Sequence, residues 1–224
     1  MRRFLKHNGL SIAFLVLFIA AVGGQAIAGH ADFNEEQIRH GDPELSLTRY
    51  VVSADFGAAV MENWQSEFLQ FTLFILLTVW LLQRGSPESK ELDKAGLESD
   101  EEQKVGPHAE QNSPLWAKVE GIRRTIYENS LLLVMTAIWL GTWFAQSVTG
   151  WTQYNSERLD HHMDTLGWWH YLGRPDFWEK TLQNWQSEFL AVGTMAIFAV
   201  YLRQRGSPES KPVGAPHTAT GVEG

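Results

Sequence analysis

The sequence contains no cysteine among its 224 residues, which excludes disulfide bonds, thiol catalysis and thiolate metal sites. Basic residues are also scarce, because 18 lysines and arginines stand against 26 aspartates and glutamates, giving a net charge of −8. Proteins that bind nucleic acid through its phosphates carry a basic surface. We therefore expect no nucleic-acid partner.

The sequence also lacks the short motifs of common enzyme classes. It has no nucleophile elbow, no Walker loop, no GxGxxG fingerprint and no HExxH zinc motif. Five histidines lie between the apolar segments without helical ligand spacing: His30, His40, His161, His162 and His170. We predict no catalytic residue, no cofactor and no metal site, and a protein that is not an enzyme.

Apolar residues are concentrated in four blocks, and charged residues lie almost entirely between them. Residues 9–28 form a run of 20 uncharged residues, about the length that crosses a hydrocarbon core as a helix. Residues 56–83 contain no helix breaker after Gly57, and a helix of that length measures about 42 Å. Residues 130–149 and 177–204 repeat this pattern. The sequence thus predicts four transmembrane helices, with exposed loops at residues 30–54 and 150–175.

An internal duplication accounts for the repeated pattern. A shift of 121 residues aligns residues 2–90 with 123–211 without a gap and gives 30 identities in 89 positions. Two heptapeptides are fully identical between the copies, namely NWQSEFL at 63–69 and 184–190, and RGSPESK at 84–90 and 205–211. Long internal repeats indicate that one structural unit occurs twice. We predict an all-α membrane protein made of two tandem helical hairpins, related by a pseudo-two-fold axis along the membrane normal.

The predicted organisation has four parts: a first transmembrane hairpin at 1–90, a charged cytoplasmic linker at 91–121, a second hairpin at 122–211 and a disordered tail at 212–224. The linker and the tail are polar and poor in large apolar side chains, which is typical of disorder. Asp55 and Asp176 are predicted to cap the N-termini of the second helix of each hairpin. Gly85 and Gly206 are predicted to end those helices.

Residues 1–28 also fit a cleaved signal peptide. They begin with basic residues, continue with an apolar stretch and end with Ala26-Ile27-Ala28 before Gly29. The aligned segment 130–149 lies in the middle of the chain, where signal peptidase would not act. The duplication therefore favours a retained transmembrane helix.

The distribution of lysine and arginine predicts the orientation. Residues 1–8, 83–124 and 203–224 hold 13 of the 18 basic residues. Cytoplasmic loops carry an excess of such residues. We expect a multi-pass protein of the bacterial inner membrane with both termini in the cytoplasm. Its partner is the lipid bilayer, and a second copy or another membrane protein stays open as a further partner.

Polar residues inside the predicted spans form the candidate site. It comprises three residues from each copy: Glu67, Glu188, Gln25, Gln146, Asn63 and Asn184. Intramembrane carboxylates are energetically costly and usually face the protein interior or water. Facing carboxylates could share a proton or hold a cation, or Gln–Glu hydrogen bonds could simply pin the helices together. Trp64 and Trp185 are predicted to be anchors at the membrane interface.

The order of these motifs resembles a family of bacterial integral membrane proteins known as a domain of unknown function. The resemblance rests on residues 63–70 and 83–90, and on their counterparts 184–190 and 204–211. Ala191 departs from the longer motif, since the first copy has glutamine at that position. The resemblance implies four membrane helices and brings no activity and no catalytic residues.

Three functions are compatible with this sequence. The first is a structural or accessory inner-membrane protein without enzymatic activity. The alternative is a small proton- or cation-coupled carrier or channel that uses Glu67 and Glu188. A membrane enzyme that acts on lipid at the outer interface is a weaker third possibility.

Overall fold

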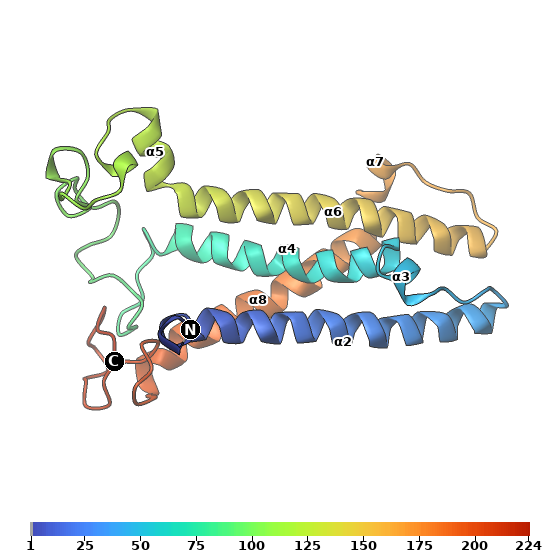
Figure 1. The fold of residues 1–224 in the computed structure, drawn as a ribbon, viewed down its shortest axis with the longest axis horizontal. Helices are drawn as coiled ribbons and strands as arrows, with labels where there is room; N and C mark the ends of the chain where they lie inside the picture. Colours follow the sequence, from blue (N-terminus) through green and yellow to red (C-terminus); the bar gives the residue numbers. More distant parts are fainter. Residues whose placement is uncertain (1) are drawn as a thin grey trace. The chain divides into compact units, whose positions relative to one another are not determined.

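All regular secondary structure in the computed structural model, which describes residues 2–224, is helical. Four long helices carry most of the chain (Figure 1): α2 (Gly9–His40), α4 (Ala54–Leu77), α6 (Ser130–Asp160) and α8 (Pro175–Tyr201). The short helices are α1 (Arg2–His7), α3 (Leu47–Tyr50), η1 (Gly106–His108), η2 (Leu115–Ala117), α5 (Ile122–Glu128) and α7 (Trp168–Tyr171). Residues 2–224 contain no strand, so the prediction of an all-α protein is confirmed.

Helix α2 continues to His40, well beyond its predicted end at residue 28. No proline interrupts the polar extension, and Glu35 and Arg39 form an ion pair one turn apart at 2.5 Å. The helix stops at Gly41, whose φ of 83° gives a left-handed C-cap. Helix α6 likewise runs on to Asp160. The prediction that residues 30 and 150 begin loops is therefore wrong.

Helices α4 and α8 end earlier than predicted, at Leu77 and Tyr201. After α4, the Thr78 hydroxyl donates to Phe74 O at 2.6 Å, and Trp80 N closes a tight turn onto Leu77 O at 3.0 Å. The 24 residues of α4 measure about 36 Å, which still exceeds the roughly 30 Å of a hydrocarbon core.

The predicted N-caps, Asp55 and Asp176, lie two residues too far along the chain. Ser53 precedes α4, and its Oγ accepts a hydrogen bond from Phe56 N at 3.3 Å. Helix α8 begins at Pro175 after Arg174, which makes no side-chain capping bond. Asp55 and Asp176 fall instead in the first turn of each helix, where a negative charge favours the helix dipole.

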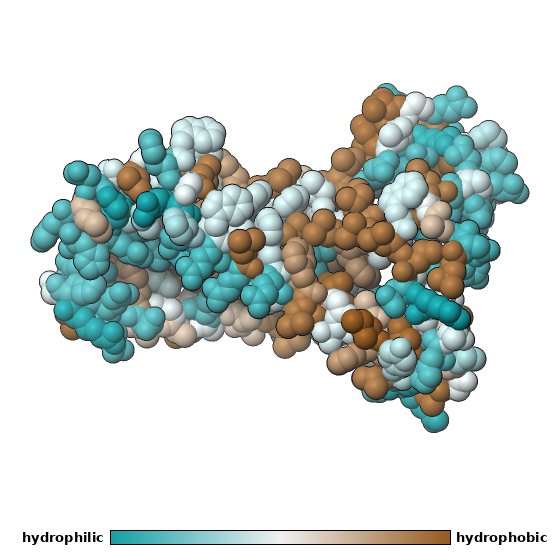
Figure 2. Space-filling view, turned by 180° about the vertical axis from the view of Figure 1, so that it is seen from behind, coloured by the Kyte–Doolittle hydropathy of each residue, from teal (hydrophilic) through white to brown (hydrophobic). Residues whose placement is uncertain are grey.

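Two of the long helices, α2 and α6, contain an 18-residue stretch apolar enough to cross a membrane. None of that stretch is buried in α2, and 17% of it is buried in α6. A core helix of a soluble protein would be mostly covered. Large apolar side chains instead remain on the surface, as Figure 2 shows. Helices α4 and α8 fall short of this criterion because each contains the polar heptapeptide NWQSEFL.

Contacts along the backbone divide the chain into two compact units. The first unit comprises Met1–Met61 and Ala145–Tyr171, and the second comprises Glu62–Phe144 and Leu172–Gly224. Each is described by itself below.

The first unit holds two loops closed by the same pair of hydrogen bonds. Asn34 donates from Nδ2 to Leu45 O at 2.9 Å and accepts from Leu45 N at 2.9 Å. Asn155 and Leu166, which lie 121 residues further on, make the same two bonds at 2.9 Å and 2.8 Å. Each asparagine thus fastens the segment after its helix back onto the helix.

A tyrosine also packs against a glycine in each half of the first unit. A Cβ atom added to Gly29 would lie 2.4 Å from the Tyr50 hydroxyl oxygen, and one added to Gly150 would lie 2.6 Å from that of Tyr171. Both tyrosines are buried. Only glycine permits the helix to approach the ring this closely.

In the second unit the two RGSPESK segments also make matching bonds. Ser89 Oγ accepts from Gln83 N at 3.0 Å, and Ser210 Oγ accepts from Gln204 N at 2.9 Å. Both segments turn at a glycine with φ above 80°. Because α4 and α8 have already ended at Leu77 and Tyr201, the prediction that these glycines end the helices is wrong.

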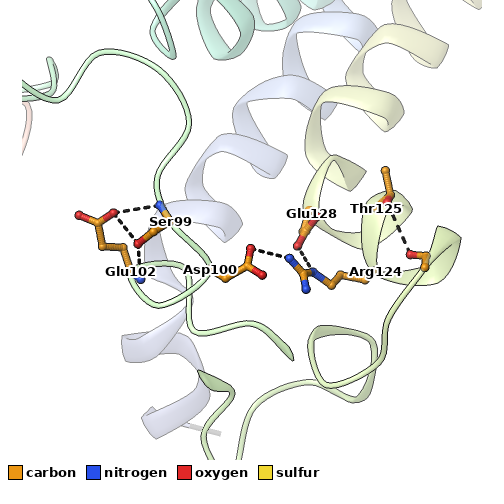
Figure 3. Close-up of polar contacts among 7 residues, drawn as sticks. Ser99, Asp100, Glu102, Arg124, Thr125 and Glu128 are labelled. Atoms are coloured by element: carbon orange, nitrogen blue, oxygen red, sulfur yellow. Dashed lines mark hydrogen bonds and ion pairs between the residues drawn. The ribbon is translucent and has the colours of Figure 1, made fainter. Parts of the chain in front are cut away.

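The linker between the two copies makes defined polar contacts (Figure 3). Arg124 at the start of α5 bridges two carboxylates, Asp100 at 2.5 Å and Glu128 at 2.6 Å. Ser99 donates from both its backbone N and its hydroxyl to Glu102, each at 2.9 Å. The acidic linker is thus tied to the beginning of the second copy.

Candidate polar site on helices α4 and α8

The two NWQSEFL segments contact each other within the second unit. In α4, residues 65 and 66 are almost completely buried, whereas the same residues of the α8 copy, Gln186 and Ser187, are exposed. Identical sequences therefore occupy different environments, and the contact between the two helices is asymmetric.

A hydrogen bond between Trp185 and Gln65 forms the centre of this contact. Trp185 Nε1 donates to Gln65 Oε1 at 2.7 Å. The amide nitrogen of Gln65 donates in turn to Glu62 O at 3.1 Å, so both ends of this fully buried side chain are satisfied. A buried polar group that is paired at both ends fixes the register of the two helices.

The carboxylate of Glu188 lies beside the same contact. It is hydrogen-bonded to Ser66 and lies within electrostatic range of Glu67. Ser66 also donates to Asn63 O at 2.9 Å. Glu188 is half-buried and Glu67 is exposed. The charges of the two predicted glutamates thus interact, and their role as a site stays a prediction.

An aromatic cluster supports Trp185 from α6. The ring of Trp143 lies 5.6 Å from that of Trp185 and stacks on Trp139 at 5.9 Å. It also contacts Phe177 at 6.4 Å and Trp178 at 6.2 Å. These contacts hold the indole of Trp185 in the orientation that its hydrogen bond requires.

The remaining residues of the predicted site lie on other parts of the fold. Asn184 donates to Lys180 O at 2.8 Å within its own helix. Gln25 and Gln146 belong to the first unit, on α2 and α6, and Gln146 is buried. The pairing of these glutamines with Glu67 and Glu188 stays a prediction. Anchoring of the protein at the membrane interface by Trp64 and Trp185 also stays a prediction.

Sequence reasoning missed a charged contact of Glu62, which directly precedes the first heptapeptide. Lys180 forms an ion pair with Asp176 at 3.5 Å, and both charges act on Glu62 of α4. The alignment concealed this contact because position 183, the counterpart of Glu62, is a glutamine.

A second polar cluster, also missed, joins the two RGSPESK segments. Glu88 and Glu209 are counterparts in the alignment, and their carboxyl groups are hydrogen-bonded. This bond, partial desolvation and the charges of Glu209 and Glu223 raise the pKa of Glu88 to about 7. Both glutamates line a cavity of about 360 Å³ together with residues of α4 and α8. The exact repetition of a heptapeptide that contains a glutamate was the available sequence signal.

Lys211, the last residue of the second RGSPESK segment, is buried and surrounded by backbone oxygens. Its Nζ donates to the carbonyls of Gly85 at 2.5 Å, His217 at 2.9 Å, Ala219 at 3.2 Å and Pro216 at 3.3 Å. Burial lowers the pKa of this amine, and the charge of Arg203 lowers it further. The lysine thereby ties the C-terminal residues to the first RGSPESK segment.

The chemistry of these clusters is that of hydrogen bonding and proton sharing. Within residues 2–224, no group of three or more His, Cys, Asp or Glu side chains is arranged to hold a metal ion. The serines of the heptapeptides donate to carbonyls three residues earlier in their own helices, in the manner of helix-stabilising hydroxyls.

Comparison with known proteins gave one match. The model of a family described as "Domain of unknown function (DUF6766)" matches residues 1–222. No curated protein and no solved structure matches the chain.

Proposed function

The chain belongs to the DUF6766 family, and we propose that it is a structural or accessory protein of the bacterial inner membrane, without enzymatic activity. In this proposal all four long helices cross the bilayer. The two hairpins are tandem copies of one unit, and polar contacts between α4 and α8 hold them together. Both termini and the linker face the cytoplasm.

The distribution of basic residues supports four spans. Residues 83–124, which include the linker, hold seven lysines and arginines, and residues 1–8 and 203–224 together hold six. If all three lie on the cytoplasmic side, α4 must return the chain after α2 has crossed, and α8 must do so after α6. The continuous helix through Ala28 also supports retention of α2, because cleavage at that point would cut it in two.

The matching contacts support tandem duplication of one hairpin. The Asn34–Leu45 clasp and its counterpart 121 residues away have the same two bonds, and the Gly29–Tyr50 contact also recurs. Chance similarity in sequence would not be expected to reproduce the same bonds at the same spacing.

The hydrogen bond from Trp185 to Gln65 carries the proposed structural role. In a bilayer, apolar helix faces gain little by leaving lipid for each other, so interhelical hydrogen bonds and close packing determine association. The buried Gln65 side chain, satisfied at both ends, fits that role.

The absence of cysteine makes the topology directly testable. Single cysteines would be placed at Ser46, Asn112, Thr165 and Thr218, all exposed. A membrane-impermeant maleimide should label Ser46→Cys and Thr165→Cys in intact spheroplasts. It should label Asn112→Cys and Thr218→Cys only in inverted vesicles. Labelling of Asn112→Cys or Thr218→Cys in spheroplasts would refute the proposed topology.

The closeness of Glu188 to Glu67 and Ser66 favours a second candidate, a proton- or cation-coupled carrier. Two carboxylates at one place in a membrane can share a proton or bind a cation. Flux of H⁺, Na⁺ and K⁺ should be measured in proteoliposomes with the natural protein and with Glu67→Gln/Glu188→Gln. The structural role predicts no flux above that of protein-free liposomes. Flux that the double substitution abolishes would establish the carrier instead.

A further inference from the structure

We propose that a cavity in the first unit binds a small organic cation with more than one ammonium group, of the aliphatic polyamine class. The cavity has a volume of about 420 Å³, within the range of small-molecule sites, roughly 300–1,000 Å³. Its walls are the C-terminal parts of α2 and α6, Tyr50 of α3 and the beginning of α4. The inference concerns ligand binding and does not depend on the proposed membrane role.

The charges around this cavity are predominantly acidic. Five carboxylates line it, from three helices: Asp32 and Glu36 of α2, Asp55 of α4, and Glu157 and Asp160 of α6. No lysine or arginine of the described chain lines it. Because the carboxylates come from three helices, a ligand with several separated positive charges can contact more of them than a single point charge can.

The side chain of Tyr50 is an independent indication of a ligand. Its exposed fraction is only 6%, it lines the cavity, and within residues 2–224 its hydroxyl has no hydrogen-bond partner. The rings of His30, Phe33 and Phe56 hold it in place, with centroids 5.5 to 5.8 Å away. Burial and the nearby charge of Asp55 raise the pKa of the phenol, so it stays neutral. The phenol oxygen is not one of the fully enclosed unpartnered atoms of the described chain, so it is accessible from the cavity, where a ligand amine would donate to it.

The two copies contribute to the cavity in matching pairs. Glu36 and Glu157 are counterparts in the alignment, and so are His40 and His161. Phe33 adds an aromatic face, which attracts ammonium groups and packs against methylene chains. The described residues contain no cluster arranged for a metal ion. An extended amine therefore fits these walls better than Ca²⁺ or Mg²⁺ does.

Isothermal titration calorimetry on the full-length protein in detergent tests the proposal. The probes are spermidine and, separately, Ca²⁺, each at low ionic strength. We expect saturable binding of spermidine and only weak binding of Ca²⁺. Spermidine should also raise the thermal midpoint of the natural protein more than NaCl of equal ionic strength does, a readout that requires no variant.

Two variants and two controls locate the site. Glu36→Gln/Glu157→Gln should weaken spermidine binding by about tenfold or more, and Tyr50→Phe by about three- to tenfold, through loss of charged and neutral hydrogen bonds. Glu35→Gln removes one charge beside the cavity, and Tyr171→Phe removes the equivalent hydroxyl, so neither should change affinity by more than about twofold. The proposal is overturned if spermidine does not bind, if Glu35→Gln weakens binding as strongly as Glu36→Gln/Glu157→Gln does, or if Ca²⁺ binds more tightly than spermidine.

Discussion

Glu88 and Glu209 occupy the same position in two copies of one heptapeptide, and their carboxyl groups are hydrogen-bonded to each other. Such a pair requires one shared proton, because two carboxylates at this distance repel each other. The contact joins the two RGSPESK segments at the ends of α4 and α8 and makes their association sensitive to pH.

The first prediction concerns this pH dependence. The pKa of Glu88 is raised from 4.5 to about 7 in the folded protein. Its contribution to stability is therefore complete below about pH 4.5 and is lost as the pH rises through about 7. Glu88→Gln can donate at any pH, so it should flatten the dependence of the thermal midpoint between pH 5 and 8. The effect should stay below about 1 kcal/mol, since Glu88 is exposed.

Glu101→Gln, an exposed change in the linker, is the control for this experiment. It should leave the pH profile of the thermal midpoint unchanged. Equal profiles for the natural protein and Glu88→Gln would mean that the carboxyl pair does not contribute to stability.

The second prediction uses the asymmetry of the two NWQSEFL copies. Gln65→Leu removes the acceptor of Trp185 Nε1. It should lower the free energy of unfolding in detergent by about 1–2 kcal/mol, the cost of a lost bond and an unpaired buried donor. Gln186→Leu changes the same residue in the same sequence context but at an exposed position, and should cost less than about 0.5 kcal/mol. Equal losses would show that the Trp185–Gln65 bond does not stabilise the protein.

The helical character of the fold could be predicted because apolar runs and turn-forming glycines are local features of the sequence. The predicted start of α2 at residue 9 agrees with the structure. Gly85 and Gly206 lie in left-handed turns, but α4 and α8 end before them, at Leu77 and Tyr201. The ends of α2 and α6 could not be predicted from the length of a membrane span. A helix continues beyond an apolar run wherever the sequence permits it. On α2, the ion pair between Glu35 and Arg39 stabilises this continuation.

The candidate site was only partly predictable for a different reason. Alignment of the copies identified Glu67 and Glu188, whose charges interact in the structure. It could not show which of two identical glutamines would be buried, since that depends on packing against Trp143 and its neighbours. It also concealed Glu62, because the aligned residue in the second copy, Gln183, is uncharged.

The third prediction concerns the close approach of Gly29 to Tyr50. Gly29→Ala would place a methyl group 2.4 Å from the phenol oxygen, and should destabilise the protein by about 1–3 kcal/mol through overpacking. Adding Tyr50→Phe removes that oxygen, so the double variant should recover part of the loss in a thermal denaturation assay. Gly23→Ala has nothing within 4 Å and should be neutral or stabilising by up to about 1 kcal/mol, as expected for alanine in a helix. Failure of Tyr50→Phe to rescue Gly29→Ala would place the strain elsewhere.

The fourth prediction concerns the amine of Lys211, which holds the C-terminal residues by four carbonyl groups. Lys211→Met keeps the length of the side chain but removes every donor, so these carbonyls would lose their partner. The tail should then detach, and amide exchange at Gly221, whose N–H donates to Ser86 O at 3.0 Å, should accelerate by about tenfold or more. Lys90→Met is the matched control, because the Lys90 amine contacts Gly96 and Glu98 of the linker and not the C-terminal residues. If the two variants exchange at the same rate at Gly221, the carbonyl cage around Lys211 does not hold the tail.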